Sequence, residues 1–171
     1  LCLANGLAGN PLIRDGSPEL AVFQTLLDDA CHDLALQVCR DGEGVTKVVE
    51  LLVKGARTQA EAKLVAKTIA TSSLVKTALF GEDANWGRIM AAIGRSGALI
   101  DPRKIGLAFA GIPIVKGGVT LGPSAERRIE RVVRRKEFTI TVDLGQGPHR
   151  TNLWTTDLSH DYVKINASYR T

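Results

Sequence analysis

Hydrophobic and polar positions recur along this chain with periods that predict both helices and strands. Between residues 20 and 38 apolar side chains return every three or four positions, after a Ser17-Pro18 pair typical of a helix start. We therefore expect a long helix that ends near residue 41 and packs one face on a sheet. Residues 45–53 are rich in β-branched side chains and predict a strand buried mainly on one side.

The middle of the chain alternates between helix signals and short apolar runs. Thr58 and Glu61 form a capping-box pattern, which predicts that a helix follows. Residues 74–79 are apolar, but so short a run does not distinguish a strand from a helical turn. Asp83 or Asn85 can cap a further helix that ends at a glycine.

The last third of the chain predicts strands on both sides of one basic helix. The expected strands are 105–109, 112–115, 138–144, 150–156 and 162–165. Residues 127–136 carry six basic side chains, and their helical spacing leaves Ile129, Val132 and Val133 as an inward stripe. We interpret the basic groups as a solvated face. RNA binding is the alternative, although no aromatic residues lie between the basic ones to stack on bases.

The alternation of elements is typical of the α/β class, an α+β layered sandwich in which mixed sheets are covered by helices. The most suitable domain boundary lies between residues 57 and 58. We expect residues 1–57 to form the distal part of a catalytic layered α/β domain. Residues 58–171 would form a smaller C-terminal α/β domain.

Composition limits the class of protein without naming a function. A chain of 171 residues with 44% hydrophobic content can bury a core without metals or disulfides. Cys31 and Cys39 lie too far apart on one helix to bridge, so we expect core-filling thiols in a reduced, cytoplasmic protein. No apolar run approaches the roughly 20 residues of a membrane span, and no leader opens the chain.

The usual catalytic and metal-binding signatures are absent from the sequence. It contains no G-x-S-x-G elbow, no phosphate-binding loop, no C-x-x-C pair and no H-E-x-x-H. Its three histidines are scattered without metal-ligand spacing. The residues alone therefore name no nucleophile with its base and no metal site.

Three polar runs concentrate the remaining candidate chemistry. They are DGEGVTK at 41–47, GEDANWGR at 81–88 and YVKINASYRT at 162–171. We interpret the second run as structural, with Asp83 or Asn85 capping a helix, Trp86 packing beneath it and Arg88 pairing with a carboxylate. Direct contact with a substrate is the alternative.

In this order, the runs resemble the C-terminal part of the β chain of the ornithine acetyltransferase (ArgJ) family, bifunctional proteins of arginine biosynthesis. The resemblance extends from LANG at 3–6 to YRT at 169–171. It implies a DmpA/ArgJ-like fold and a glutamate N-acetyltransferase that moves acetyl from N-acetylornithine to glutamate through an acyl-threonine. It also implies self-cleavage of a precursor into α and β chains, which assemble as an α2β2 heterotetramer in the cytoplasm.

The resemblance assigns no catalytic residue to these 171 residues, because the family's nucleophilic threonine would lie upstream of Leu1. We expect the isolated fragment to be inactive. Three positions match family substrate-binding residues: Glu43, Asn166 and Thr171. The Glu43 carboxylate can pair with the ornithine ammonium or orient the nucleophile's amine, and the Asn166 amide offers both a donor and an acceptor. No metal, cofactor, nucleic acid or membrane is implied, and acetyl-CoA is left open as a co-substrate.

Each of these positions also has a structural interpretation. Glu43 between glycines can be a solvated loop residue, Asn166 can satisfy a turn, and Thr171 can be a frayed end.

Two other functions are left open by the residues. One is an amidase or aminopeptidase of the N-terminal-nucleophile class, in which water replaces glutamate as the acceptor. The other is a non-catalytic RNA-binding module.

Overall fold

A computed structural model of the protein describes residues 2–168. The chain divides into two compact units, Leu1–Gln37 and Val38–Thr171. The division differs from the predicted boundary at 57 and 58. It lies earlier because the strand that precedes residue 57 pairs with strands from the end of the chain.

The first unit consists of an N-terminal loop and most of helix α1 (Pro18–Arg40). The predicted helix is confirmed, and it begins at the expected Ser17-Pro18 pair. Within the first unit its apolar face is uncovered, and Phe23 is 49% exposed and Leu26 is 64% exposed. Residues 1–37 are too few to cover such a stripe by themselves.

The cysteines of α1 correct a second expectation. Cys31 is exposed and Cys39 is only partly buried, so neither fills a core. Both thiols are free. The exposure of Cys31 has the same cause as that of the apolar face, since the first unit has no second layer of structure.

The second unit is built on one mixed sheet with six strands. The strands are β1 (Val48–Ala56), β2 (Gly106–Phe109), β3 (Ile112–Lys116), β4 (Val119–Thr120), β5 (Glu137–Asp143) and β6 (His149–Thr156). Their spatial order is β4-β3-β2-β5-β1-β6. β1 and β5 are parallel, and all the other neighbours are antiparallel.

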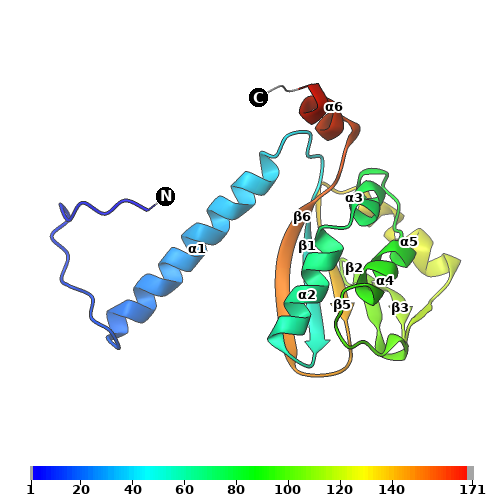
Figure 1. The fold of residues 1–171 in the computed structure, drawn as a ribbon, viewed down its shortest axis with the longest axis horizontal. Coiled ribbons are helices and arrows are strands. Elements are labelled where there is room, and N and C mark those ends of the chain that lie inside the picture. The colour runs from blue at the N-terminus through cyan, green and yellow to red at the C-terminus, as the bar shows by residue number, and fades with distance from the viewer. Residues whose placement is uncertain (1, 169–171) are drawn as a thin grey trace. The chain divides into compact units, whose positions relative to one another are not determined.

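Five helices and one 3-10 turn complete the part of the second unit that the structure describes. They are α2 (Gln59–Ala70), α3 (Ser73–Phe80), α4 (Trp86–Gly94), the turn η1 (Pro102–Lys104), α5 (Pro123–Val133) and α6 (His160–Ser168). α2 packs on β1 and β6, while α5 packs on β3 and β2 (Figure 1). The predicted α/β class, with helices covering a mixed sheet, is confirmed.

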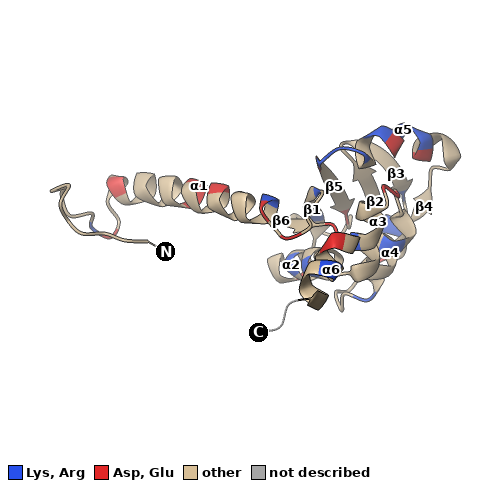
Figure 2. Cartoon of the chain, turned by 90° about the horizontal axis from the view of Figure 1, so that it is seen from above, with Lys and Arg blue, Asp and Glu red and all other residues tan. Residues whose placement is uncertain are grey.

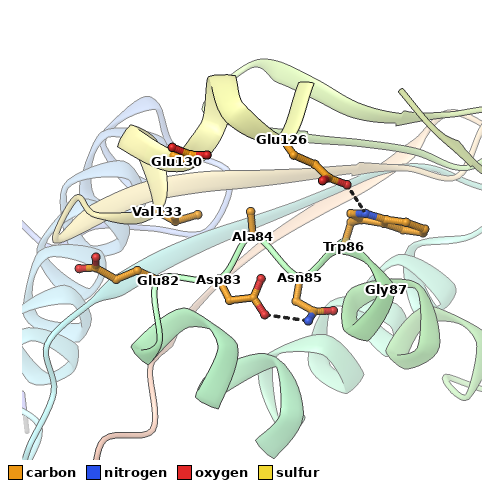
Figure 3. Close-up of a pocket in the computed structure, with 9 residues that line it drawn as sticks. All are labelled: Glu82, Asp83, Ala84, Asn85, Trp86, Gly87, Glu126, Glu130 and Val133. Carbon is orange, nitrogen blue, oxygen red and sulfur yellow. Dashed lines mark hydrogen bonds between the residues drawn. The ribbon is translucent and has the colours of Figure 1, made fainter. Parts of the chain in front are cut away.

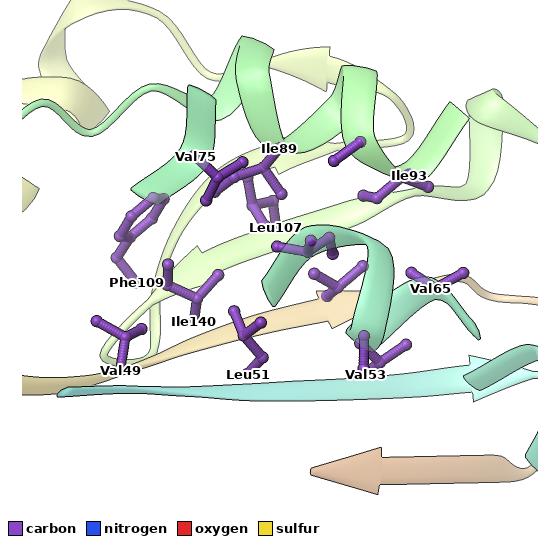
Figure 4. Close-up of a cluster of buried hydrophobic side chains, with 14 of the residues drawn as sticks. Val49, Leu51, Val53, Val65, Val75, Ile89, Ile93, Leu107, Phe109 and Ile140 are labelled. Carbon is purple, nitrogen blue, oxygen red and sulfur yellow. The ribbon is translucent and has the colours of Figure 1, made fainter. Parts of the chain in front are cut away.

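The core lies between the sheet and the helices that cover it. Val49, Leu51 and Val53 of β1 point to the face of the sheet that the helices cover and are completely buried, as Ile140 of β5 is (Figure 4). On the opposite face of the same strands, Glu50 accepts hydrogen bonds from Thr139 and Asn152. The alternation confirms the prediction of a strand buried mainly on one side.

Local capping signals locate the helices of the middle segment. The Thr58 side chain accepts from the Glu61 backbone at the start of α2, and Asn85 caps α4 through the backbone of Arg88, both as predicted. The undecided run 74–79 is helical, because Ser72 caps α3.

The predicted strand at 162–165 is wrong, since these residues lie within helix α6. Ser159 explains the difference, because its hydroxyl accepts a hydrogen bond from the Tyr162 backbone at the start of the helix. This short cap outweighs the β propensity of the run, which is itself weak evidence for a strand.

Candidate functional site

Segments from all three polar runs meet at one end of the second unit. α6 lies next to the loop of residues 41–47 that leads into β1 (Figure 1). The backbone of α3 leads directly into the second run, whose Glu82 contacts the end of the 41–47 loop. The fold therefore brings together residues that are far apart in sequence, at the end of the sheet where β1 begins.

Glu43 and Asn166 are brought together although 123 positions separate them. The Asn166 Nδ2 donates to Glu43 Oε2 at 3.2 Å and also to the backbone oxygen of Tyr162 at 2.9 Å. Both side chains are exposed. Within residues 2–168, Glu43 Oε1 and Asn166 Oδ1 accept no hydrogen bond, so both oxygens can receive a ligand. Thr171, the third predicted residue, lies outside the described residues.

Gly44 sets the close approach between the loop and α6. Its φ of +67° lies in the left-handed region, and a Cβ at this position would lie 2.4 Å from the Tyr162 nitrogen. The Ser159 hydroxyl donates to the Gly44 carbonyl at 2.6 Å. Only glycine allows this backbone conformation and this contact together. The helix that carries Asn166 is thereby seated directly on the loop that carries Glu43.

A buried carboxylate holds the far end of the same loop. Asp157, which follows β6 and is 3% exposed, accepts from the backbone nitrogens of Thr46 at 2.9 Å and Lys47 at 3.0 Å. The Thr46 hydroxyl donates to the second Asp157 oxygen at 2.5 Å. Three hydrogen bonds thus connect the residue that follows β6 to the Thr46-Lys47 pair, and all three donors come from these two adjacent residues.

Two ion pairs flank the loop. At its start, Arg40 Nε and Nη2 contact the two carboxylate oxygens of Glu137 at 2.8 and 3.1 Å. The Arg40 hydrogen bond lowers the pKa of Glu137 from its ordinary value of 4.5. At the other end, the buried Lys47 contacts Glu82 at 3.3 Å. Glu82 belongs to the second polar run and has a φ of 55°.

The second run lines a cavity of about 420 Å³ between the start of α4 and α5 (Figure 3). The Trp86 ring nitrogen donates to Glu126 at 3.2 Å, and Asn85 donates to Asp83 at 2.8 Å. The structural interpretation of the run is confirmed for the Asn85 cap. It is wrong for Arg88, which donates to the Leu74 backbone oxygen at 2.8 Å instead of pairing with a carboxylate.

A second cavity, of about 380 Å³, adjoins the 41–47 loop. It is lined by Arg40, residues 45–48, Lys136 and Glu137. Its charged side chains are mainly basic, whereas those of the cavity beside Trp86 are acidic. Thr46 and Lys47, whose backbone nitrogens donate to Asp157, belong to its lining.

The basic helix α5 shows the predicted division between its faces. Ile129, Val132 and Val133 are buried, whereas the arginines of the helix are exposed. Acidic residues are interspersed with them along the helix (Figure 2). This mixed charge is typical of a solvated face.

Residues 2–168 contain neither a side-chain cluster for a metal ion nor a helix that could cross a membrane. Their His, Cys, Asp and Glu side chains form no group of three that could hold a metal ion. Their helices include none with the length and apolar content needed to cross a bilayer.

The sequence identified the two residues that meet at the site but not the residues that bring them there. Asp157 and Ser159 were missed because their partners lie 111 and 115 positions away. The only local signal was Ser159 itself, which precedes His160-Asp161 in a typical helix-start pattern.

Comparison with known proteins supports the family resemblance over the whole chain. A model of the ArgJ family matches residues 1–171. A Geobacter sulfurreducens protein named arginine biosynthesis bifunctional protein ArgJ is 53% identical over 171 residues, which are 100% of this chain and 44% of that protein. A mitochondrial ArgJ of Schizosaccharomyces japonicus is 46% identical, over 98% of this chain and 40% of its own length.

A solved structure agrees with these relatives. The crystal structure of arginine biosynthesis bifunctional protein ArgJ from Bacillus halodurans has a TM-score of 0.88 and 43% sequence identity. The match covers 96% of this chain and 77% of the solved chain. The present chain spans less than half the length of the curated relatives that it matches.

Proposed function

The chain belongs to the ArgJ family, and on this premise we propose that it forms part of an acyltransferase of arginine biosynthesis. The reaction is the transfer of an acetyl group from N-acetylornithine to glutamate. The names of the relatives support the pathway. The residues described above supply one wall of the substrate site, and the reactive hydroxyl comes from a threonine on another segment of the complete protein.

The chemistry proceeds in two half-reactions. In the first, the threonine hydroxyl attacks the amide carbonyl of N-acetylornithine, the carbon–nitrogen bond breaks, and ornithine leaves with the proton as a free amine. The acetyl group then forms an ester with the threonine. In the second half-reaction the amine of glutamate attacks the ester, which yields N-acetylglutamate and restores the hydroxyl. Backbone donors outside this chain stabilise the oxyanion in both steps.

Glu43 and Asn166 bind the charged groups of the substrate in this proposal. The Glu43 carboxylate pairs with an ammonium of ornithine, because a charge-assisted hydrogen bond is about twice as strong as a neutral one. Asn166 uses Nδ2 to hold Glu43 and presents Oδ1 as an acceptor. The single observation that carries the proposal is their contact across 123 positions of a chain whose family is known. Thr171 is proposed as a third substrate contact.

The proposal extends to the assembly, processing and location of the complete protein. We assign the chain to an α2β2 heterotetramer of α and β chains produced by self-cleavage, located in the cytoplasm and working without a cofactor. The solved Bacillus halodurans chain supports two-chain processing, because the present chain covers a much larger share of it than of the curated relatives. Acetyl-CoA would be an additional acetyl donor for glutamate.

The test is the kinetics of the complete protein. Acetyl transfer should follow ping-pong kinetics, with N-acetylglutamate as the product and little free acetate. An amidase would instead release acetate without requiring glutamate. Replacing N-acetylornithine with acetyl-CoA in the same assay decides whether the second donor is accepted.

Glu43→Gln in the complete protein should lower kcat/KM for N-acetylornithine by about 10- to 100-fold, because a hydrogen bond to a charged group contributes about 1.5–3 kcal/mol. The matched control is Asp161→Asn, which removes an exposed carboxylate from the first turn of α6. Its kcat/KM should stay within about twofold of the wild type. An unchanged kcat/KM in Glu43→Gln would remove this carboxylate from the substrate site.

A further inference from the structure

Asp157 is the most deeply buried carboxylate near the candidate site. It is 3% exposed, and it accepts hydrogen bonds from the Thr46 and Lys47 backbone and from the Thr46 hydroxyl. Within residues 2–168 it has no salt bridge to a basic side chain, and its hydrogen bonds to the loop all come from this pair. An ionised carboxylate in such a place costs several kcal/mol to desolvate. The cost is offset by donors that lie three and four positions after Glu43.

The contacts form a continuous path from Asp157 to the Glu43–Asn166 pair. Asp157 fixes the end of the loop, and Ser159, two residues later, fixes its middle through the Gly44 carbonyl at 2.6 Å. The same Ser159 hydroxyl accepts from the Tyr162 backbone and thereby begins α6. α6 then carries Asn166 to Glu43. Both members of the pair are thus located by the segment that begins at Asp157.

We propose that Asp157 is a positioning residue for Glu43 in the acetyl transfer. It acts through the Thr46-Lys47 backbone, which it holds so that the Glu43 carboxylate faces the ammonium of the substrate. The role rests on the proposed function and adds a residue to it. Asp157 itself is enclosed by the loop and does not touch the substrate.

Thr155 provides a contrast on the same strand end. It is 6% exposed, and its hydroxyl donates to the Ala70 backbone oxygen at 2.9 Å, toward the end of α2. This hydrogen bond is buried, as that of Asp157 with Lys47 is, but its acceptor lies on α2 and not on the loop. Thr155→Val therefore serves as a matched control that removes a buried hydrogen bond without releasing Glu43.

The test is a double-mutant cycle on the complete protein, with kcat/KM for acetyl transfer from N-acetylornithine as the readout. Asp157→Asn keeps the shape of the side chain, but its amide nitrogen cannot accept a hydrogen bond. We expect it to lower kcat/KM by about 100-fold, as a displacement of roughly 1 Å in a positioning group can. In the Glu43→Gln background the same substitution should cost less than about threefold, because the carboxylate that it positions is absent.

The control separates positioning from general loss of structure. Thr155→Val should lower kcat/KM by the same factor in the wild-type and Glu43→Gln backgrounds. Thr46→Val is a milder second variant, which removes only the hydroxyl donor and keeps both backbone donors. Its loss of about fivefold should also disappear in the Glu43→Gln background, and it decides the question if Asp157→Asn does not fold.

The outcomes are distinct. Full-sized losses from Asp157→Asn or Thr46→Val in the Glu43→Gln background, as for Thr155→Val, would overturn the positioning role and leave the proposed function standing. A complete wild-type protein without acetyl transfer would overturn the proposed function, and the positioning role with it.

Discussion

Glu43 and Asp157 are two carboxylates that act on the same loop from opposite environments. Glu43 is exposed and, among the described residues, accepts one hydrogen bond, from Asn166. Asp157 is buried and accepts three. The two carboxylates therefore have different roles at this end of the molecule. The exposed carboxylate of Glu43 is available to a ligand, whereas the oxygens of Asp157 accept hydrogen bonds from the chain itself.

The first way to break this arrangement is to separate the loop from α6. Gly44→Ala should destabilise the second unit by roughly 2–3 kcal/mol, because the new Cβ would lie 2.4 Å from the Tyr162 nitrogen at a φ of +67°. Gly111→Ala is the control, since its φ is +79° but nothing lies within 4 Å of its Cβ position. It should cost about 1 kcal/mol. Urea unfolding of the two variants compares them, and equal losses would show that contact with α6 contributes nothing.

The second prediction compares the two carboxylates directly. Asp157→Asn should lower the free energy of unfolding by about 2 kcal/mol, because it removes charge-assisted hydrogen bonds inside the protein. Glu43→Gln should change it by less than about 0.5 kcal/mol, as is usual for exposed positions. Chemical denaturation followed by circular dichroism measures both. A larger loss in Glu43→Gln than in Asp157→Asn would reverse the assignment of the two roles.

The smallest expected effect concerns the ion pair at the start of the loop. The Arg40 hydrogen bond lowers the pKa of Glu137, so the pair stabilises the folded state above pH 4.5, the ordinary value for this side chain. The contribution is lost as the pH falls through the lowered pKa of the folded state. It should stay below about 1 kcal/mol, because both side chains are about half exposed.

Arg40→Gln tests this pair. Its free energy of unfolding should be slightly below that of the wild type at pH 7, and the difference should vanish at low pH. Urea titrations of both proteins across this pH range measure it. A difference that persists unchanged at low pH would mean that Arg40 stabilises the fold through packing, not through Glu137.

The sequence predicted those features whose causes are local. The caps of α2 and α4 each depend on residues three positions apart, and both were found where the pattern placed them. The strand β1 was predicted for the same reason, since alternation is visible in one short window. Glu43 and Asn166 were identified through the family resemblance, and no pattern in the residues predicts that they touch.

The features that were not predicted depend on distant partners. The hydrogen bonds of Asp157 join residues 110 and 111 positions apart, which no periodicity records. The β propensity of residues 162–165 predicts a strand where α6 lies, because that propensity does not include the capping hydrogen bond that Ser159 accepts. The apolar stripe of α1 was read correctly as a helix face, but its burial requires structure that residues 1–37 do not provide.

The most direct test of the account is a crystal structure of the complete protein with ornithine bound. We predict that an ammonium nitrogen of ornithine lies within about 3.2 Å of a Glu43 carboxylate oxygen, with Asn166 Nδ2 still donating to the same side chain. Ornithine bound elsewhere, with Glu43 in contact with solvent alone, would contradict the claim that Glu43 and Asn166 form a wall of the substrate site.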